Sequence, residues 1–327
     1  MIGYYVHHRG SGHRHRALAI ARALDEPMTG LSSAAAPDGW TGEWIELPLD
    51  TDTAPPVDPR AGDRLHWAPK GSTGLRERMG ILSAWLVEAQ PEAVVVDVSV
   101  EVAALVRLHG IPVITVAQPG DRRDPAHQLG YDLSDAIIAP WPRGFEPLVT
   151  SLGAAAKVRP VGTISRVDIA AAPTTERNGV VVLRGYGGTG EGALERAVSD
   201  LRARGIEVAE ATGSSEQIAQ SLRAASVVLS HCGQNAVAEI AATRTPAVLI
   251  ADDRPHEEQR AFALALQRFG APAAVFADAP ATDFDWSAAV RTSAALDGDR
   301  WSLFASGAGA AAAAQVIREV ARTGVGA

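Results

Sequence analysis

A turn between a predicted strand and a predicted helix carries the residues best suited to chemistry in this chain. Residues 226–230 form a short apolar run, and the sequence SHCGQNAVAE extends from Ser230 to Glu239. The first N–H groups of a helix are free donors with partial positive charge, so a helix that begins near Gln234 suits a diphosphate. His231 and Asn235 add side-chain donors at the same place.

The same helix carries a carboxylate at a useful distance. Glu239 lies eight positions after His231, a little over two helical turns further along. Its two oxygens could accept hydrogen bonds from a ribose diol. We predict that this turn, Gly233 and Gln234 included, binds a nucleotide. The alternative is an ordinary connection between a strand and a helix, with an asparagine near the helix start.

A second turn joins the first predicted strand to the first predicted helix. Residues 1–6 are a short β-type run, GSGH spans residues 10–13, and residues 14–24 have helical spacing. His13 would face the crevice at the strand ends, and an imidazole titrates near neutral pH, as a general base must. Asp97 ends another apolar strand and could orient the second ring nitrogen of His13. The alternative is that His13 only caps the helix or packs.

Further polar and aromatic residues fall at strand ends and loops that a ligand could reach. Glu258 and Gln259 precede a predicted helix one unit after the nucleotide turn, and they suit sugar hydroxyls. The loop at 50–74 and the segment after the strand at 112–117 are candidates for the acceptor. Their candidate residues are His66, Trp67, Gln118 and His127. Trp67 could equally belong to the core.

A glycine-rich turn offers a rival interpretation. The sequence GYGGTG at 185–190 follows a predicted strand and opens a helix, and Glu207 lies 22 residues after Gly185. This is a passable dinucleotide fingerprint, which would indicate a nicotinamide cofactor. A nicotinamide enzyme would not need the turn after Ser230 as well. The turn also resembles the one that GT-B glycosyltransferases use near the donor phosphates, and that resemblance implies that Gly185, Gly187 and Gly188 bind the donor.

The order of predicted elements indicates an α/β protein with two doubly wound, Rossmann-like domains that face a central cleft. Strands buried on both faces alternate with helices, which is typical of a parallel sheet with ligands at the carboxyl ends of its strands. The pattern restarts after Pro160. We predict domains at 1–160 and 179–327, joined by a linker at 161–178, with a last helix near 305–322 that could return to the first domain.

Composition excludes several classes of function. The net charge of −8 divides evenly between the halves, so no basic half is present to bind nucleic acid. Neither a membrane span nor a signal peptide is visible, and the single cysteine, Cys232, fits a reducing cytoplasm. Three Asp-x-Asp sequences, at 50–52, 283–285 and 297–299, follow no convincing strand, so we expect no metal and no other cofactor.

The stretch 231–259 resembles the donor-binding signature of GT-B glycosyltransferases, such as the UDP-sugar transferases of plants and bacteria and the glucosaminyl transferase of peptidoglycan synthesis. The resemblance implies that His231 and Asn235 bind the donor phosphates and that Glu239 holds the ribose. It implies that Glu258 and Gln259 bind the sugar. Gln234 and Ala236 depart from the plant-type pattern, so the identity of the base stays open.

The N-terminal half resembles the same family. Gly12 and His13 lie in its GxGH turn, and Asp97 ends a strand that precedes a helix and the sequence GIPV. In inverting plant-type transferases a catalytic His–Asp pair occupies these places. The resemblance therefore implies that His13, oriented by Asp97, takes the acceptor proton while a sugar is transferred, with inversion, from a UDP- or dTDP-sugar to an acceptor hydroxyl.

Two other functions stay open. Residues 10–16 read GxGHxxR and resemble the nucleotide-sugar hydrolases of nonulosonic acid synthesis, which share the GT-B fold and activate water. A non-catalytic subunit that binds a sugar nucleotide is the second alternative. The acceptor is not identified by the sequence, and a lipid acceptor would bring peripheral contact with a membrane.

Overall fold

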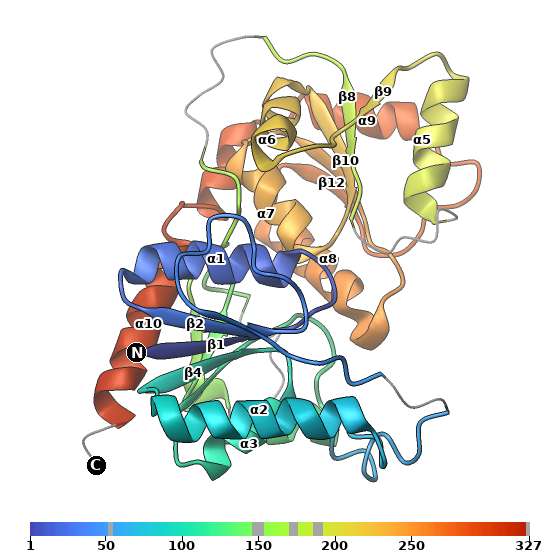
Figure 1. The fold of residues 1–327 in the computed structure, drawn as a ribbon. Coiled ribbons are helices and arrows are strands. Elements are labelled where there is room, and N and C mark those ends of the chain that lie inside the picture. Colours follow the sequence, from blue (N-terminus) through green and yellow to red (C-terminus); the bar gives the residue numbers. More distant parts are fainter. Residues whose placement is uncertain (52–54, 146–153, 170–175, 186–191, 325–327) are drawn as a thin grey trace.

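The computed structural model of the 327-residue chain describes residues 1–51, 55–145, 154–169, 176–185 and 192–324. These residues form two sheets, one from each half of the chain, and helices cover both faces of each sheet (Figure 1). All the strand pairs of both sheets are parallel. The prediction of a parallel α/β architecture is therefore confirmed.

The N-terminal sheet has seven strands in the order β3-β2-β1-β4-β5-β6-β7. Its strands are β1 (Ile2–Val6), β2 (Met28–Ser32), β3 (Trp44–Glu46), β4 (Ala93–Asp97), β5 (Val113–Val116), β6 (Ala136–Ala139) and β7 (Val158–Pro160). The helices between them are α1 (Gly12–Leu24), α2 (Thr73–Ala89), α3 (Val100–Leu108), α4 (Pro125–Leu133) and the 3-10 turn η2 (Ala155–Lys157).

The C-terminal sheet has five strands in the order β12-β11-β10-β8-β9. Its strands are β8 (Val180–Leu183), β9 (Val208–Glu210), β10 (Val227–His231), β11 (Ala247–Ile250) and β12 (Ala273–Phe276). The α-helices of this half are α5 (Ala193–Ala203), α6 (Ser215–Ala224), α7 (Gln234–Ala242), α8 (Glu258–Phe269), α9 (Trp286–Ala294) and α10 (Gly309–Gly324). Two 3-10 helices, η3 (Pro255–Glu257) and η4 (Gly298–Leu303), complete it.

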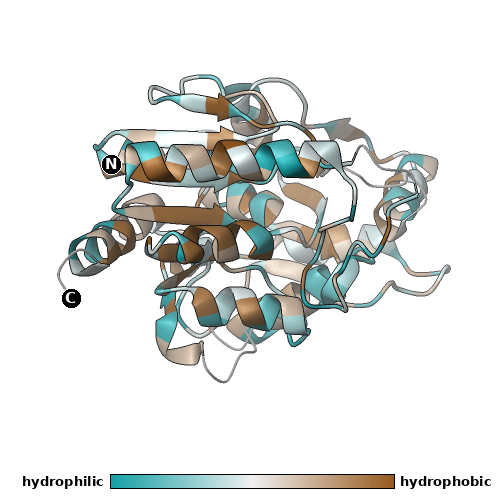
Figure 2. Cartoon of the chain, turned by 60° about the horizontal axis from the view of Figure 1, so that its bottom comes forward, coloured by the Kyte–Doolittle hydropathy of each residue, from teal (hydrophilic) through white to brown (hydrophobic). Residues whose placement is uncertain are grey.

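Alternating side chains of the buried strands build a core on each face of the N-terminal sheet. Tyr4 of β1 packs on one face with α1 and α10, whereas Tyr5 packs on the other face with α2 and α3. Figure 2 shows the central strands in brown, while the outer helices alternate between teal and brown. Strands hidden on both faces must be apolar throughout, which explains runs such as AVVVD in β4.

The last helix of the chain packs on the first half of the molecule. Residues of α10, among them Ala313 and Ile317, lie in the same core as Ile20 of α1, and Arg318 Nη1 donates to the Leu24 carbonyl at 2.9 Å. Figure 1 shows α10 in red beside α1 and β1. The domain boundaries proposed from the sequence stay predictions, and residues 170–175 of the proposed linker lie outside the described residues.

Aromatic residues join the two halves. Trp141 and Phe145, which follow β6, belong to the core that β8, β10 and α8 form, and the Phe145 ring lies 6.0 Å from that of Phe262. The apolar contact makes one continuous body of the two sheets. Among the described residues, the helices are too short or too polar to cross a membrane.

Candidate active site

The strand orders of the two sheets place the candidate site. Connections leave in opposite directions from β1 and β4 in the N-terminal sheet, and from β8 and β10 in the C-terminal sheet, so a crevice opens at each pair. His13 follows β1, Asp97 ends β4, Gly185 follows β8 and His231 ends β10. A cavity of about 480 Å³ lies between the sheets at these strand ends and is lined by both halves.

Asp97 lies beneath the cavity and holds His13 in its wall. The His13 Nδ1 atom lies 2.9 Å from Asp97 Oδ1, and 17% of the His13 side chain is exposed, whereas Asp97 is fully buried. Donation of the Nδ1 proton to the carboxylate leaves Nε2 free to accept a proton. The pairing predicted from the sequence is present in the structure, although no contact with a substrate tests its role.

Arg16, which the sequence did not predict as a site residue, shares the same carboxylate. Its Nε and Nη2 atoms donate to the two oxygens of Asp97 at 3.0 and 2.9 Å, and the Tyr4 hydroxyl donates at 3.3 Å. Burial alone would raise the pKa of Asp97, but Arg16 and His13 hold it well below its usual range. Arg16 lies one helical turn after His13, and the GxGHxxR pattern was the available signal.

The turn after β10 presents donors to the cavity. The backbone N–H of Gly233 donates to His231 Nδ1 at 3.0 Å. Burial, followed by Arg254, lowers the pKa of His231, so the ring is neutral and carries its proton on Nε2. His231 Nε2 and Gln234 Nε2 are buried and have no hydrogen-bond partner among the described residues. Helix α7 begins at Gln234, where the sequence predicted it, and its first N–H groups add to these donors.

Two glycines allow close approaches in the cavity wall, Gly12 between the two halves and Gly185 within the C-terminal half. A Cβ atom at position 12 would overlap the side-chain amide of Asn235, and one at position 185 would overlap the His231 ring. Gly12 and Gly185 both line the cavity. Gly187 and Gly188, also predicted to bind the donor, lie outside the described residues.

Glu239 lines the cavity with a partner that the sequence did not predict. Burial raises the pKa of this carboxyl, and Arg166 opposes the shift. Arg166 Nε lies 2.8 Å from one carboxylate oxygen and Nη2 donates to the other at 3.2 Å. Each oxygen keeps a second lone pair, so the pair fixes the carboxylate without filling its capacity to accept.

The two residues predicted to bind the sugar also line the cavity, but they differ in exposure and in hydrogen-bond partners. Glu258 is partly exposed, and Arg122 Nη2 of the other half donates to it at 3.4 Å. Gln259 is almost fully buried and accepts the Asp252 N–H at 3.0 Å, while its Nε2 lies 3.4 Å from His231 Nδ1. Glu258 is therefore the better placed of the two to contact a sugar, and Gln259 positions His231.

Three of the four predicted acceptor residues lie together. His66, Gln118 and His127 line a small cavity of about 30 Å³, and Gln118 also lines the large cavity. Trp67 lines neither of them, because its indole N–H donates to the Asp50 carbonyl at 2.8 Å. The small cavity holds about one water molecule.

His15 of α1 also lines the cavity of about 480 Å³, and burial, Arg166 and Arg14 lower its pKa to about 4. The rival dinucleotide fingerprint fails on geometry. Glu207 precedes β9 and so lies at the opposite end of that strand from the crevice, where it cannot reach a ribose.

Comparison with known proteins agrees with this geometry. Residues 175–282 match the glycosyltransferase family 28 C-terminal domain. None of the curated protein sequences matches the chain. Many solved structures are similar, among them a glycotransferase of kitacinnamycin, with a TM-score of 0.65, 16% identity and 98% of both chains covered.

Two further structures illustrate the range of this fold. MurG of Acinetobacter baumannii has a TM-score of 0.58 and 14% identity over 97% of this chain and 99% of MurG. The spinosyn rhamnosyltransferase SpnG, complexed with thymidine diphosphate, has a TM-score of 0.55 and 17% identity over 98% of this chain and 96% of SpnG.

The chain therefore has the GT-B fold, as the sequence predicted. The family match covers the half that carries the nucleotide turn at Ser230. The fold and the family match together support the class predicted from the sequence, a glycosyltransferase that uses a nucleotide-sugar donor.

Proposed function

We propose that the protein transfers a sugar from a UDP- or dTDP-sugar to an acceptor hydroxyl with inversion at the anomeric carbon. The observation that carries this proposal is the shared cavity. His13 and the first turn of α7 line the same cavity, so we place a base and a diphosphate site around one bound donor.

Groups of the cavity and the two substrates account for the proton and for both bonds that change in the proposed transfer. His13 Nε2 takes the proton of the acceptor hydroxyl, and that oxygen forms a bond to the anomeric carbon. The bond from this carbon to the diphosphate breaks on the opposite face, and the nucleoside diphosphate leaves with the electron pair. His231, Asn235 and the N-terminus of α7 stabilise its negative charge.

We assign each part of the donor to residues that line the cavity. The diphosphate would lie at Gly12, Gly185 and α7, the ribose at Glu239, and the sugar at Glu258. These donors and dipoles supply the positive potential that a leaving diphosphate needs, so the proposed reaction needs no metal cofactor.

Mass spectrometry of UDP- and dTDP-sugars incubated with pools of acceptors tests the proposal. We expect a sugar–acceptor product of opposite anomeric configuration, which NMR of the purified product reports. His13→Ala should lower kcat by about 10²- to 10⁴-fold with little change in donor binding. Full activity in His13→Ala would exclude His13 as the base.

A nucleotide-sugar hydrolase is the second candidate, because Arg16 of the GxGHxxR sequence contacts both Asp97 and His13. Incubation with donor alone separates the two functions. Release of free sugar and nucleoside diphosphate from donor alone, at the rate measured with acceptors, would favour hydrolysis. Release of nucleoside diphosphate only when an acceptor is present, with the sugar on that acceptor, favours transfer.

A further inference from the structure

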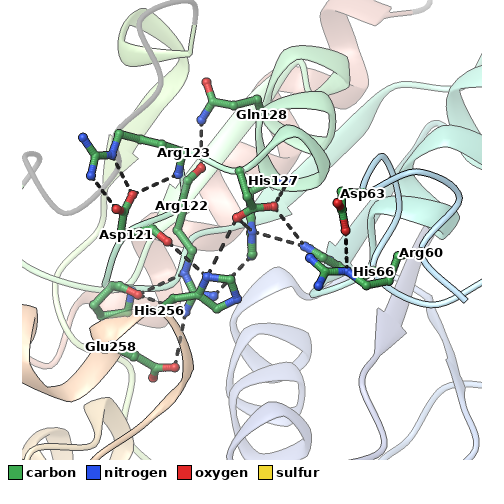
Figure 3. A network of polar contacts seen from close by, with 12 residues as sticks. Arg60, Asp63, His66, Asp121, Arg122, Arg123, His127, Gln128, His256 and Glu258 are labelled. Carbon is green, nitrogen blue, oxygen red and sulfur yellow. Dashed lines mark hydrogen bonds and ion pairs between the residues drawn. The ribbon is translucent and has the colours of Figure 1, made fainter.

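Three histidines and an aspartate gather at the contact between the two halves, away from the donor cavity. Figure 3 shows His66 from the loop before α2, His127 from the first turn of α4 and His256 from η3. Asp124 is the N-cap of α4. The chain has nine histidines, and three of them meet here from segments far apart in sequence.

The separations suit a metal ion. Ligand atoms of His66, Asp124 and His127 all lie within 4.8 Å of one another. His66 Nε2 lies 3.2 Å from His127 Nδ1 and 3.6 Å from Asp124 Oδ1. Bonds of about 2.0–2.1 Å in a tetrahedral site place neighbouring ligand atoms about 3.3–3.4 Å apart. The hydrogen bond of 2.5 Å between His127 Nδ1 and Asp124 Oδ2 would have to open by about 1 Å.

The protein holds these ligands in place before any ion binds. The backbone N–H groups of His66 and Trp67 both donate to Glu101 Oε1, at 2.7 and 2.9 Å. The Asp124 carboxylate accepts the His127 N–H at 3.1 Å as the cap of α4. Little conformational freedom would therefore be lost when the ligands converge on an ion.

His256 approaches this three-residue group from the other half of the molecule. Its Nδ1 lies 3.8 Å from Asp124 Oδ2 and 3.2 Å from the Asp121 carbonyl. To bind an ion, Nδ1 would exchange its contact with the Asp121 carbonyl for the metal, and the ring proton would lie on Nε2.

We propose that His66, Asp124 and His127 form a binding site for a divalent transition-metal ion of the zinc class. His256 supplies the fourth ligand across the contact between the halves. Imidazole and carboxylate ligands in this ratio suit Zn²⁺, and they differ from the oxygen-rich sites of Mg²⁺ and Ca²⁺.

The bound ion would clamp the two halves together. The segment at 120–122 already docks on η3, because the Asp121 N–H donates to the His256 carbonyl at 2.7 Å and a Cβ at Gly120 would overlap that carbonyl. None of the four ligands lines the donor cavity. The site therefore stands independently of the function proposed above, and its ion takes no part in the transfer step.

Arg122 opposes the ion in a way that can be tested. Its Nη1 lies 3.2 Å from His127 Nε2 and donates to it, which places the ring proton on Nδ1, toward Asp124. A metal bound to Nδ1 requires that proton on Nε2, where it would face the guanidinium. A glutamine at position 122 can instead accept a hydrogen bond from Nε2, so Arg122→Gln should bind the ion more tightly.

Equilibrium dialysis of the tag-free, full-length protein against Zn²⁺ tests the site. We expect one Zn²⁺ per chain, and we expect Co²⁺ in its place to give the visible absorption of a tetrahedral complex. His66→Ala and His127→Ala should each weaken binding by at least about tenfold, the lower end of the cost of losing even an outer partner.

His109→Ala is the matched control, because both ring nitrogens of His109 have partners on α2 and α3, at Ser83 and Leu105. It should bind Zn²⁺ as the unaltered protein does. The site would be overturned if the unaltered protein bound no stoichiometric Zn²⁺, or if His66→Ala and His127→Ala bound Zn²⁺ as tightly as the unaltered protein does. If His256→Ala alone leaves the affinity unchanged, the ion does not bridge the halves and the clamp is overturned.

Discussion

Arg16 and His13 meet at one oxygen of a buried carboxylate. His13 Nδ1 and Arg16 Nη2 each lie 2.9 Å from Asp97 Oδ1 and 3.0 Å from each other. If His13 Nδ1 carries a proton, Nε2 is a base. If Arg16 donates to Nδ1 instead, the neutral ring carries its proton on Nε2 and loses that role. Arg16 therefore competes with Asp97 for control of the His13 tautomer.

Substitution of Arg16 should change the pH dependence of the reaction. In Arg16→Met the charge of Asp97 acts on His13 alone, which stabilises the imidazolium. The acid limb of the kcat/KM profile should therefore move to higher pH. The measurement is the pH–rate profile of both proteins with the best donor and acceptor. Arg16→Lys keeps a positive charge and should leave the limb close to its original position.

Loss of Arg16 also leaves Asp97 short of partners, and breaking a buried pair costs about 3–5 kcal/mol. Thermal unfolding of each variant shows whether the profile was recorded on folded protein. An acid limb at the same pH in folded Arg16→Met would show that Arg16 does not tune the base.

Local patterns in the sequence predicted the elements that hold the site, but not the partners that adjust it. The apolar run before Asp97 and the glycines before His13 each follow from a few neighbouring residues, and the structure has both. Strands β2 and β3 were not predicted, since MTGLS and WIE are too short and irregular to show a period.

The contacts missed by the sequence connect distant segments. Arg166 reaches Glu239 across 73 positions, and Arg122 reaches Glu258 across 136 positions. The sequence around an arginine carries no pattern that identifies which carboxylate it will contact in the folded chain. For the same reason, the cluster around His127 is visible only in three dimensions.

Gly12→Ala should weaken donor binding without unfolding the protein. The new Cβ would overlap the end of the Asn235 side chain, which can rotate away at small cost to stability. A rotated Asn235 no longer donates to the phosphates, so the donor KM should rise by about tenfold, the equivalent of one hydrogen bond to a charged group. Initial rates at varied donor and a thermal melt measure the two effects.

Gly10→Ala provides the comparison, because nothing lies within 4 Å of a Cβ at that position, although its φ of 81° strains an alanine. It should lower the melting temperature and leave donor KM nearly unchanged. The opposite pattern, with KM raised in Gly10→Ala and normal in Gly12→Ala, would contradict the contact argument.

Protonation of buried histidines should destabilise the protein as the pH falls from about 6.5 to 4. Burial, His66 and Arg122 lower the pKa of His127 to about 4, against an ordinary value near 6.5. Between pH 6.5 and about pH 4 the unfolded chain binds the proton, whereas the folded chain does not. The free energy of unfolding therefore has its full value above about pH 6.5 and falls as the pH drops through this window. The effect reaches about 3 kcal/mol for a largely buried ring with this shift.

Urea unfolding at a series of pH values, with a chelator present, measures this loss. His127→Gln does not titrate, so its free energy of unfolding should fall less across the window, by about 3 kcal/mol. His7 and His15, whose pKa values are also lowered to about 4, should account for part of the remaining slope. Equal slopes in His127→Gln and the unaltered protein would show that His127 is not buried neutral.

Glu239 should distinguish a ribonucleotide from a deoxyribonucleotide. Arg166 fixes both carboxylate oxygens, and the remaining lone pairs can accept from both hydroxyls of a ribose but only one of a 2′-deoxyribose. Calorimetry with UDP and 2′-deoxy-UDP should give a preference of roughly 10- to 100-fold for UDP, the equivalent of a hydrogen bond to a charged group. Glu239→Gln should lose most of this preference. Because Arg166→Lys keeps the charge but not the two-point contact, we expect it to retain only part of the preference. A preference unchanged in Glu239→Gln would place the ribose elsewhere in the cavity.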